Sequence, residues 1–362
     1  MHAPGGMTRL GPAAVLAGLG LGLLAGLLGS PVAEPRAGAA GAVRVVARGL
    51  VVPWALAFAP DGRLFVTERP GRLRLVEDGR LAPSPLATFP VAAVGEGGLM
   101  GLALDPGFSS NRRLYVCYTH EAGGRLENRV VRLTLEDGRA GDEQRVVDGI
   151  PGAPIHDGCR LAFGPDGKLY VTTGDAADAP LAQRRDSLAG KILRLEPDGR
   201  IPADNPFPGS PVYSLGHRNP QGLDWDAAGH LIEAEHGSSA RDEINHVQAG
   251  RNYGWPEVRG RAGDRRFVDP LAESGEETWA PAGLAVVGHE VFVAALRGRR
   301  LLRFRLGPEP TLHAEPAWLQ GTYGRLRAVV RGPDGALYVT TSNRDGRGTP
   351  AADDDRILRV VP

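Results

Sequence analysis

The sequence predicts an all-β protein: a six-bladed β-propeller with four-stranded antiparallel blades. A segment of the type "FAPDGRLFVTER" recurs six times along the chain, which is the signature of a repeat architecture. The 51 Gly and 30 Pro among 362 residues indicate many turns between short strands. No long helical periodicity competes with this interpretation. A two-sheet β-sandwich is the alternative, but sandwiches do not show such a repeat.

Three copies of the repeat are plain and three are weaker. The plain copies span 58–69, 163–175 and 331–343, and the weaker ones span 104–120, 225–237 and 287–298. Their strand-like segments begin at Leu64, Leu114, Leu169, Leu231, Val291 and Leu337. The copies lie about 45–60 residues apart, which is the size of one propeller blade.

Each repeat encodes a hairpin. Asp-Gly or a similar turn joins two strands, and the second strand, of the "LYVTT" type, is apolar and β-branched, as expected for burial on both faces. A third strand often follows, at 191–197, 300–306 and 356–361. One such sheet cannot bury its own faces, whereas six arranged radially can. The segment 43–50 has no turn partner, so we expect it to lie beside 356–361 and close the ring.

Residues 1–40 differ in kind from the rest. An apolar run from Pro12 to Leu28 follows an early arginine and precedes small residues, which predicts an export signal with a short linker. Cleavage is expected between Gly29 and Ala42. Because the run is about 17 residues long, an uncleaved membrane anchor is the alternative. Residues 41–362 are predicted to form a single propeller domain in the periplasm or outside the cell.

The bulk charge gives no hint of a nucleic-acid partner. Lys and Arg number 42, and so do Asp and Glu, so nothing points to nucleic acid or to an anionic membrane surface. An exported protein could pair Cys117 with Cys159, but we expect two free buried thiols.

His156 and Asp175 flank the third repeat. A two-stranded hairpin brings its two ends to one side of a blade, so the pair could meet. A carboxylate that is hydrogen-bonded to an imidazole orients it and raises its basicity. The alternative is a capped turn and a surface histidine.

Two loops could bind a ligand directly. Arg218 and Asn219 lie in a Gly/Pro-containing loop at 214–226, the kind of segment where binding residues are common. The glycines of 94–106 permit a close backbone approach, with Glu96 as the polar residue at the tip. Ordinary turn chemistry is the alternative for both.

Two further clusters carry charge. The stretch 235–258 contains Glu243 and loop carbonyls of the kind that Ca²⁺ prefers, although its spacing is not that of an EF-hand. Arg297, Arg325 and Arg327 lie near the ends of the fifth and sixth repeats, and guanidinium groups at a channel mouth would suit a multiply charged anion. Solvated surface charge is the alternative for both clusters.

Taken together, these motifs resemble the soluble quinoprotein aldose sugar dehydrogenases, the family that includes soluble glucose dehydrogenase. The resemblance covers roughly 48–361 and rests on "PWALAFAPDGRLFVTERPGRL", "GEGGLMGLALDP", "HDGCRLAFGPDGKLYVTTGD", "SLAGKILRLEPDGRIPADNPF", "GHRNPQGL", "EHGSSARDEIN" and "GRNYGWP", in that order. It implies a six-bladed propeller that binds pyrroloquinoline quinone (PQQ) and Ca²⁺. It also implies oxidation of the anomeric hydroxyl of aldoses to lactones, with electrons passed to an external cytochrome, quinone or dye by a monomer or homodimer.

The resemblance implies a role for each candidate. His156 is similar to the catalytic base, Asp175 to the carboxylate that orients it, and Arg218 to the residue near the quinone carbonyl that is reduced. The implied cofactor contacts are Glu96, Arg218, Asn219, Arg297, Arg325 and Arg327. The implied Ca²⁺ ligands are the carbonyls of Gly237 and Ser238 at the catalytic ion, and Glu243 with the carbonyl of Tyr253 at a second, structural ion.

The chain also departs from the family pattern. Glu96 stands where relatives often carry Gln, Arg297 where they carry Lys, and Ala328 where an Asp is common. No Tyr precedes Phe267 after "GRNYGWP", so an aromatic contact to the cofactor is expected to be missing. These departures leave room for a secreted binding propeller that lost its cofactor. A metal-dependent lactonase would explain the carboxylate-rich loops, but not the paired arginines.

Overall fold

The computed structural model describes Met1, residues 41–307, Glu309 and residues 311–361. The described residues from Gly41 onward belong to one compact unit. Apart from Met1, the predicted export signal lies outside the described residues. Among the residues that are described, no helix has both the length and the apolar character needed to cross a membrane.

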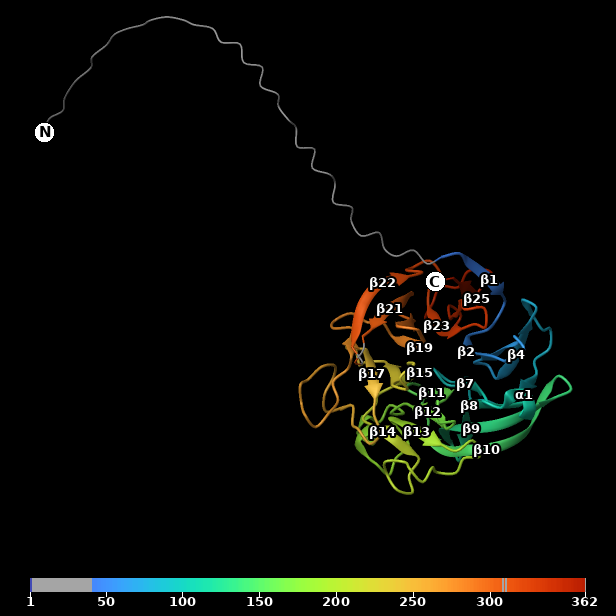
Figure 1. The fold of residues 1–362 in the computed structure, drawn as a ribbon, viewed down its shortest axis with the longest axis horizontal. Helices are drawn as coiled ribbons and strands as arrows, with labels where there is room; N and C mark the ends of the chain where they lie inside the picture. Colours follow the sequence, from blue (N-terminus) through green and yellow to red (C-terminus); the bar gives the residue numbers. More distant parts are fainter. Residues whose placement is uncertain (2–40, 308, 310, 362) are drawn as a thin grey trace, which may run out of the picture. The chain divides into compact units, whose positions relative to one another are not determined.

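Six antiparallel sheets surround a centre, which confirms the predicted six-bladed propeller (Figure 1). Blade 1 contains β2 (Pro53–Phe58), β3 (Leu64–Glu68), β4 (Arg72–Glu77), β5 (Arg80–Leu81) and β6 (Ala87–Thr88). Blade 2 contains β7 (Leu99–Leu104), β8 (Arg113–Ala122), β9 (Arg125–Glu136) and β10 (Arg139–Pro151). Blade 3 contains β11 (Gly158–Phe163), β12 (Leu169–Thr173), β13 (Lys191–Leu195) and β14 (Val212–Leu215).

The second half of the ring follows the same plan. Blade 4 contains β15 (Pro220–Trp225), β16 (Leu231–Glu235), β17 (Glu243–Val247) and β18 (Ala272–Glu273). Blade 5 contains β19 (Pro281–Val287), β20 (Glu290–Ala295), β21 (Arg300–Leu306) and β22 (Leu312–Trp318). Blade 6 contains β23 (Leu326–Arg331), β24 (Leu337–Thr341), β25 (Ile357–Val360) and β1 (Val43–Ala47). The helical elements in the described part are α1 (Phe108–Asn111) and the 3₁₀ helix η1 (Ala179–Gln183).

Each blade is four strands deep, as predicted, except that two short strands share the outer edge of blade 1. Both β5 and β6 pair with β4, at different ends of it. The ring closes as expected, because β1 pairs with β25 in register from Val43 opposite Val360. The innermost strands β2, β7, β11, β15, β19 and β23 line the centre of the ring (Figure 1).

The repeated Asp-Gly turns fold identically. In three blades the aspartate carboxylate accepts a hydrogen bond from the amide two residues later, and the following glycine has a positive φ that favours Gly. The aspartates are Asp61, Asp166 and Asp334. The second strand of each hairpin is largely or fully buried, for example the whole of β12, because it packs between two neighbouring blades.

The two cysteines correct one expectation. Cys117 and Cys159 form a disulfide, with their Cα atoms 5.7 Å apart, and no free cysteine occurs in the described residues. Cys117 lies in the second strand of blade 2, and Cys159 lies in the innermost strand of blade 3. Packing of adjacent blades brings these two strands together although 42 residues separate the cysteines, and spacing along the sequence did not reveal this.

Strand order decides where the candidate residues lie. In an antiparallel blade, the start of the first strand and the end of the second strand share one end of the sheet. Glu96, His156, Arg218 and Arg325 precede first strands. A second set follows second strands: Asp175, Gly237 and Arg297. Both sets therefore lie at one end of the propeller, and the Asp-Gly turns lie at the other.

Candidate active site

His156 lies between two partners of opposite charge. Its Nδ1 is 2.7 Å from Oδ1 of Asp175, and its Nε2 is 2.9 Å from a guanidinium nitrogen of Arg218. Guanidinium can only donate hydrogen bonds, so Nε2 must accept, and Nδ1 carries the proton that it donates to Asp175. The pairing predicted from sequence is therefore present, and it leaves the imidazole neutral with a lone pair on Nε2.

Asp175 is fixed by three donors. Besides His156, the amide of Ala177 donates to Oδ1 at 2.9 Å, and the indole nitrogen of Trp255 donates to Oδ2 at 2.8 Å. Trp255 also packs against Arg218, whose guanidinium carbon lies 5.3 Å from the ring centroid. An aromatic residue therefore borders the site despite the missing tyrosine, and the signal for it was the Trp of "GRNYGWP".

Arg218 is held by the last residue of β16 and by the loop that follows that strand. Glu235 accepts a hydrogen bond from its backbone amide at 2.6 Å, and the carbonyls of His236 and Gly237 accept from its side chain at 3.2 and 2.5 Å. Its Nε is buried and has no partner among the described residues. Burial lowers the pKa of Arg218, while the carboxylates of Asp175 and Glu235 oppose that shift.

Other buried hydrogen-bond donors in the same region also lack an acceptor among the described residues. Asn219 is fully buried, and its carbonyl oxygen accepts from the amide of Gly158 at 3.1 Å, but its Nδ2 has no partner among the described residues. Arg160 donates from Nε to the carbonyl of Gln221, yet its second terminal nitrogen is also without a partner. Buried donors are normally satisfied, so these atoms, with Nε of Arg218, fit a ligand rich in acceptor oxygens.

The side chain of Glu96 forms hydrogen bonds with both His156 and Arg347. Its carboxylate accepts from the backbone amide of His156 at 3.1 Å and from Arg347 at 2.7 Å. Burial alone would raise the pKa of Glu96, but His236, Arg347 and the His156 amide lower it to about 2. Sequence analysis did not single out Arg347, which comes from the loop after β24.

The three predicted arginines are brought to the same region. Arg325 and Arg327 share Asp345, at 2.8 and 3.8 Å, and burial lowers the pKa of Arg327 to about 10. Arg297 is exposed and lines a cavity of about 520 Å³ together with Arg325. Asp345 was missed, because the position that matches Asp175 of the third repeat holds Asn343 in the sixth, and Asp345 lies two residues further on.

The predicted metal ligands border one small cavity beside Arg218. Gly237, Ser238, Glu243 and Tyr253 all line it. The carbonyl of Gly237 accepts a hydrogen bond from Arg218 here, so a cation at that carbonyl would need the guanidinium to move aside. The set is otherwise suitable, since carbonyl and carboxylate oxygens are the ligands that Ca²⁺ prefers.

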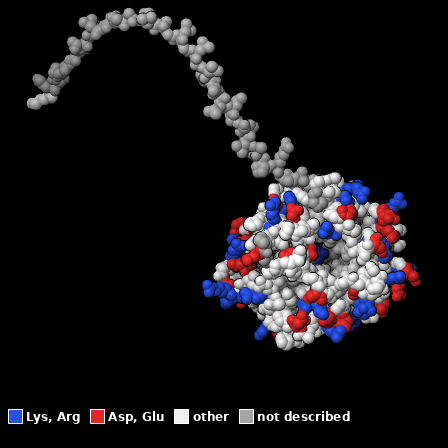
Figure 2. All heavy atoms as spheres, viewed as in Figure 1, with Lys and Arg blue, Asp and Glu red and all other residues white. Residues whose placement is uncertain are grey.

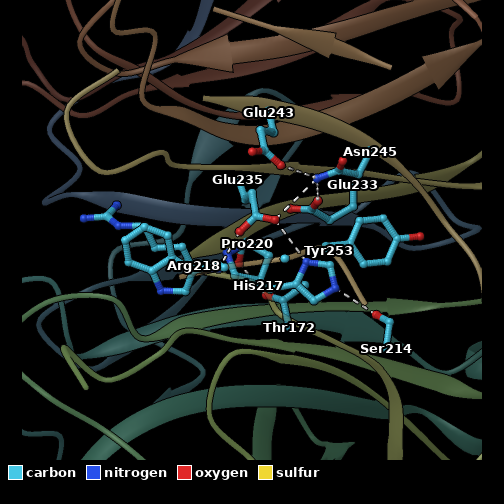
Figure 3. Close-up of polar contacts among 12 residues, drawn as sticks. Thr172, Ser214, His217, Arg218, Pro220, Glu233, Glu235, Glu243, Asn245 and Tyr253 are labelled. Atoms are coloured by element: carbon cyan, nitrogen blue, oxygen red, sulfur yellow. Dashed lines mark hydrogen bonds and ion pairs between the residues drawn. The ribbon is translucent and has the colours of Figure 1, made fainter. Parts of the chain in front are cut away.

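A buried acidic cluster lies behind this cavity (Figure 3). The amide nitrogen of Asn245 donates toward Glu233, Glu235 and Glu243 at 3.1, 3.3 and 3.3 Å. Oε1 of Glu233 and the carbonyl oxygen of Asn245 are buried and have no partner among the described residues. Burial, together with the charge of Glu235, raises the pKa of Glu243 to about 8. Buried acceptor oxygens with so few donors fit a bound cation.

Comparison with known proteins gives concordant results. Residues 50–350 match the family model described as Glucose / Sorbosone dehydrogenase. The chain is 33% identical over 339 residues to aldose sugar dehydrogenase YliI of Escherichia coli, an alignment that covers 84% of this chain and 91% of that one.

Solved structures share the fold closely. A putative oxidoreductase (glucose dehydrogenase) from Thermus thermophilus is 49% identical with a TM-score of 0.84, covering 88% of this chain and 99% of that chain. The PQQ-bound form of aldose sugar dehydrogenase from Streptomyces coelicolor is 43% identical with a TM-score of 0.82, covering 88% and 98%. The chain therefore belongs to the glucose/sorbosone dehydrogenase family.

Proposed function

We propose that this protein is a PQQ-dependent aldose dehydrogenase that oxidises the anomeric hydroxyl of sugars to lactones. The observation that carries the proposal is the neutral His156, whose Nε2 lone pair faces the site while Asp175 holds Nδ1. The names of similar proteins support it, since one is an aldose sugar dehydrogenase and another is PQQ-bound.

The cofactor site is proposed from charge and unmet hydrogen bonds. Arg297, Arg325 and Arg327 would bind the carboxylates of PQQ, because guanidinium pairs bidentately with carboxylate. The partnerless Nδ2 of Asn219 and Nε of Arg218 would donate to its remaining oxygens. When bound, PQQ supplies the quinone that accepts hydride from the sugar, and the hard redox chemistry belongs to the cofactor.

In the proposed mechanism His156 is the general base. Nε2 would take the proton of the anomeric hydroxyl, and Asp175 would stabilise the imidazolium that forms. In this structure the guanidinium of Arg218 donates a hydrogen bond to Nε2 of His156, so it must turn aside before the sugar hydroxyl can bind there. The same movement would free the carbonyl of Gly237 for Ca²⁺. Acid should inhibit the reaction, since a protonated imidazole cannot accept the proton.

The remaining assignments follow from the sequence. We propose Ca²⁺ at the carbonyls of Gly237 and Ser238, and a second ion at Glu243 and the carbonyl of Tyr253. We further propose that residues 1–40 direct export and that the electrons leave to an external acceptor. These assignments rest on the resemblance and on the acceptor-rich surroundings described above.

Substitution of His156 by Gln tests the mechanism. The variant should bind PQQ with unchanged affinity by absorbance titration, yet turn over at least roughly a hundredfold more slowly, the usual scale for a lost general base. His230 provides a matched control, because it forms a similar pair with Asp226 at 2.8 Å in the turn at the opposite end of blade 4. His230→Gln should keep full activity. Full activity in His156→Gln would refute the role of His156, and lactone hydrolysis without a quinone would favour a lactonase.

A further inference from the structure

Three potential metal ligands gather in blade 2 and take no part in the proposed reaction. His120, Glu127 and Asp148 each offer one ligand atom, and these three atoms all lie within 4.8 Å of one another. The residues come from β8, β9 and β10, the three outer strands of the blade (Figure 1). Because neighbouring strands run antiparallel, the end of β8, the start of β9 and the end of β10 share one end of the sheet. This is the end of the propeller at which His156 lies.

His120 offers a lone pair that no donor meets. Its Nδ1 lies 3.3 Å from the carbonyl oxygen of Glu121, which can only accept, so Nδ1 carries a proton. In the neutral imidazole Nε2 is then an acceptor, and it is buried with no hydrogen-bond partner among the described residues. The residue keeps only 8% of its surface exposed. Because buried polar atoms are normally satisfied, this nitrogen fits a cation.

The atom that faces Nε2 of His120 is a second acceptor. Oδ1 of Asp148 lies 3.5 Å from Nε2, which is longer than a normal hydrogen bond. Zinc–nitrogen and zinc–oxygen bonds of about 2.0–2.1 Å, set at a tetrahedral angle, separate two ligand atoms by roughly 3.4 Å. The observed separation is therefore close to what two ligands of one Zn²⁺ ion require.

Glu127 supplies the third ligand and an entry path. It lies directly opposite His120 in the ladder between β8 and β9, so the two side chains share one face of the sheet. Its carboxylate makes no hydrogen bond or ion pair with any described residue. Glu127 also lines a cavity of about 440 Å³, through which an ion and a water ligand can reach the cluster.

Donors next to the cluster orient Asp148 without using all of its acceptor capacity. Arg129 donates to Oδ1 and Oδ2 at 3.1 and 3.0 Å, and the amide of Gly149 donates to Oδ1 at 3.0 Å. Arg145 lies 3.6 Å from the same carboxylate, and its side chain is largely exposed. A carboxylate has about four lone-pair sites, so one remains for a metal ion. Hydrogen bonds of this kind orient ligating carboxylates in metal sites, and the charge of Glu127 stays uncompensated.

The general surface charge does not favour cations. Lys and Arg side chains are interspersed with Asp and Glu around the rim of the face in Figure 2, and the two kinds balance at 42 each in the sequence. A cation site must therefore depend on the arrangement of its ligands. One imidazole with two carboxylates suits Zn²⁺, whereas Ca²⁺ prefers oxygen ligands alone.

We propose that His120, Glu127 and Asp148 bind one Zn²⁺ ion, with water in the fourth position. The ion would cross-link the three outer strands of blade 2. It would thereby stabilise the end of β10, from which the chain runs on through residues 152–155 to His156. This site does not rest on the proposed function.

Calorimetric titration of the metal-stripped whole protein with Zn²⁺, in buffer that contains excess Ca²⁺, tests the site. The wild type should bind one equivalent more than His120→Gln, and Glu127→Gln should weaken that binding at least about tenfold. His230→Gln is the matched control and should bind like the wild type, because His230 pairs with Asp226 but belongs to no group of three ligands in the described part of the chain. Equal stoichiometry in the wild type and His120→Gln would overturn the proposal and leave Nε2 of His120 to a proton.

Thermal unfolding separates loss of the ion from loss of the fold. Without Zn²⁺, Glu127→Gln should melt like the wild type, since its carboxylate has no partner among the described residues. With free Zn²⁺ at about a hundredfold excess over the dissociation constant, the melting temperature of the wild type should rise by roughly 5 °C. That of Glu127→Gln should rise about half as much at the same concentration. No rise in the wild type, or an equal rise in both proteins, would contradict the proposal.

Discussion

Two carboxyl groups next to His156 have pKa values that are shifted in opposite directions. Glu96 accepts hydrogen bonds from Arg347 and from the His156 amide, and its pKa falls to about 2. Asp157 is almost fully buried, and this burial raises its pKa to about 6 despite hydrogen bonds from Asn128 and Ala153. One oxygen of Asp157 has no partner among the described residues, so ionisation of this group near neutral pH opposes folding.

We therefore expect Asp157→Asn to stabilise the protein in a pH-dependent way. The carboxyl titrates near 3.8 when unfolded and near 6 when folded, so its destabilising effect is absent below about pH 4 and complete above pH 6. Urea unfolding at pH 8 should show a gain of at least about 1 kcal/mol, which shrinks toward zero at pH 4.5. A gain of the same size at both pH values would contradict this explanation.

For single residues, the sequence predicted which side chains belong to the candidate site better than it predicted which residues they contact. The pairing of His156 with Asp175 was predictable, because both belong to one hairpin. The contacts of Glu96 with Arg347, and of Trp255 with Asp175, join loops that are 251 and 80 residues apart. Their meeting depends on how the blades are arranged around the axis, which no local spacing encodes.

Two features bind neighbouring elements together. Lys191 extends from β13 to the carbonyls of Leu181 and Ala182 in η1, at 2.9 and 3.0 Å. The disulfide from Cys117 to Cys159 joins blade 2 to blade 3, and Cys159 lies three residues after His156 in the chain. Both features hold the loops that carry the His156–Asp175 pair.

Replacing both cysteines by alanine should destabilise the fold without changing the site residues. A cross-link that closes a loop of 42 residues is worth about 2–4 kcal/mol, mainly through the unfolded chain. The melting temperature should fall, and a reductant should lower that of the wild type to a similar value while leaving the variant unaffected. Equal melting temperatures for the oxidised wild type and the variant would show that the bond is absent or energetically neutral.

The whole ring depends on a strand from the N-terminal side of the propeller. β1 pairs with β25, and Leu50 exchanges backbone hydrogen bonds with Asp355 at 3.2 and 3.0 Å. The repeat pattern predicted this closure, because 43–50 was the strand segment without a hairpin partner. The split outer edge of blade 1 was not predicted, since strands of two residues leave no periodic signal.

Removal of β1 should therefore weaken the entire propeller. A chain that begins at Gly49 would expose the edge of β25 and uncover apolar side chains of blade 6. Its urea midpoint should be clearly lower than that of a matched chain that begins at Gly41 and keeps the strand. Identical midpoints would mean that β1 does not contribute to the cooperative unit.

The proposed function depends on the arrangement of the ring, since its residues come from blades 3 to 6 and from the loop that leads into blade 2. Dye-linked oxidation of aldoses by the purified protein, with and without added PQQ and Ca²⁺, tests it most directly. We predict sugar-dependent reduction of the dye only when both are present, with loss of that activity in His156→Gln. No reduction under any condition, together with no PQQ binding by absorbance titration, would contradict the proposal and leave a propeller that binds without catalysing.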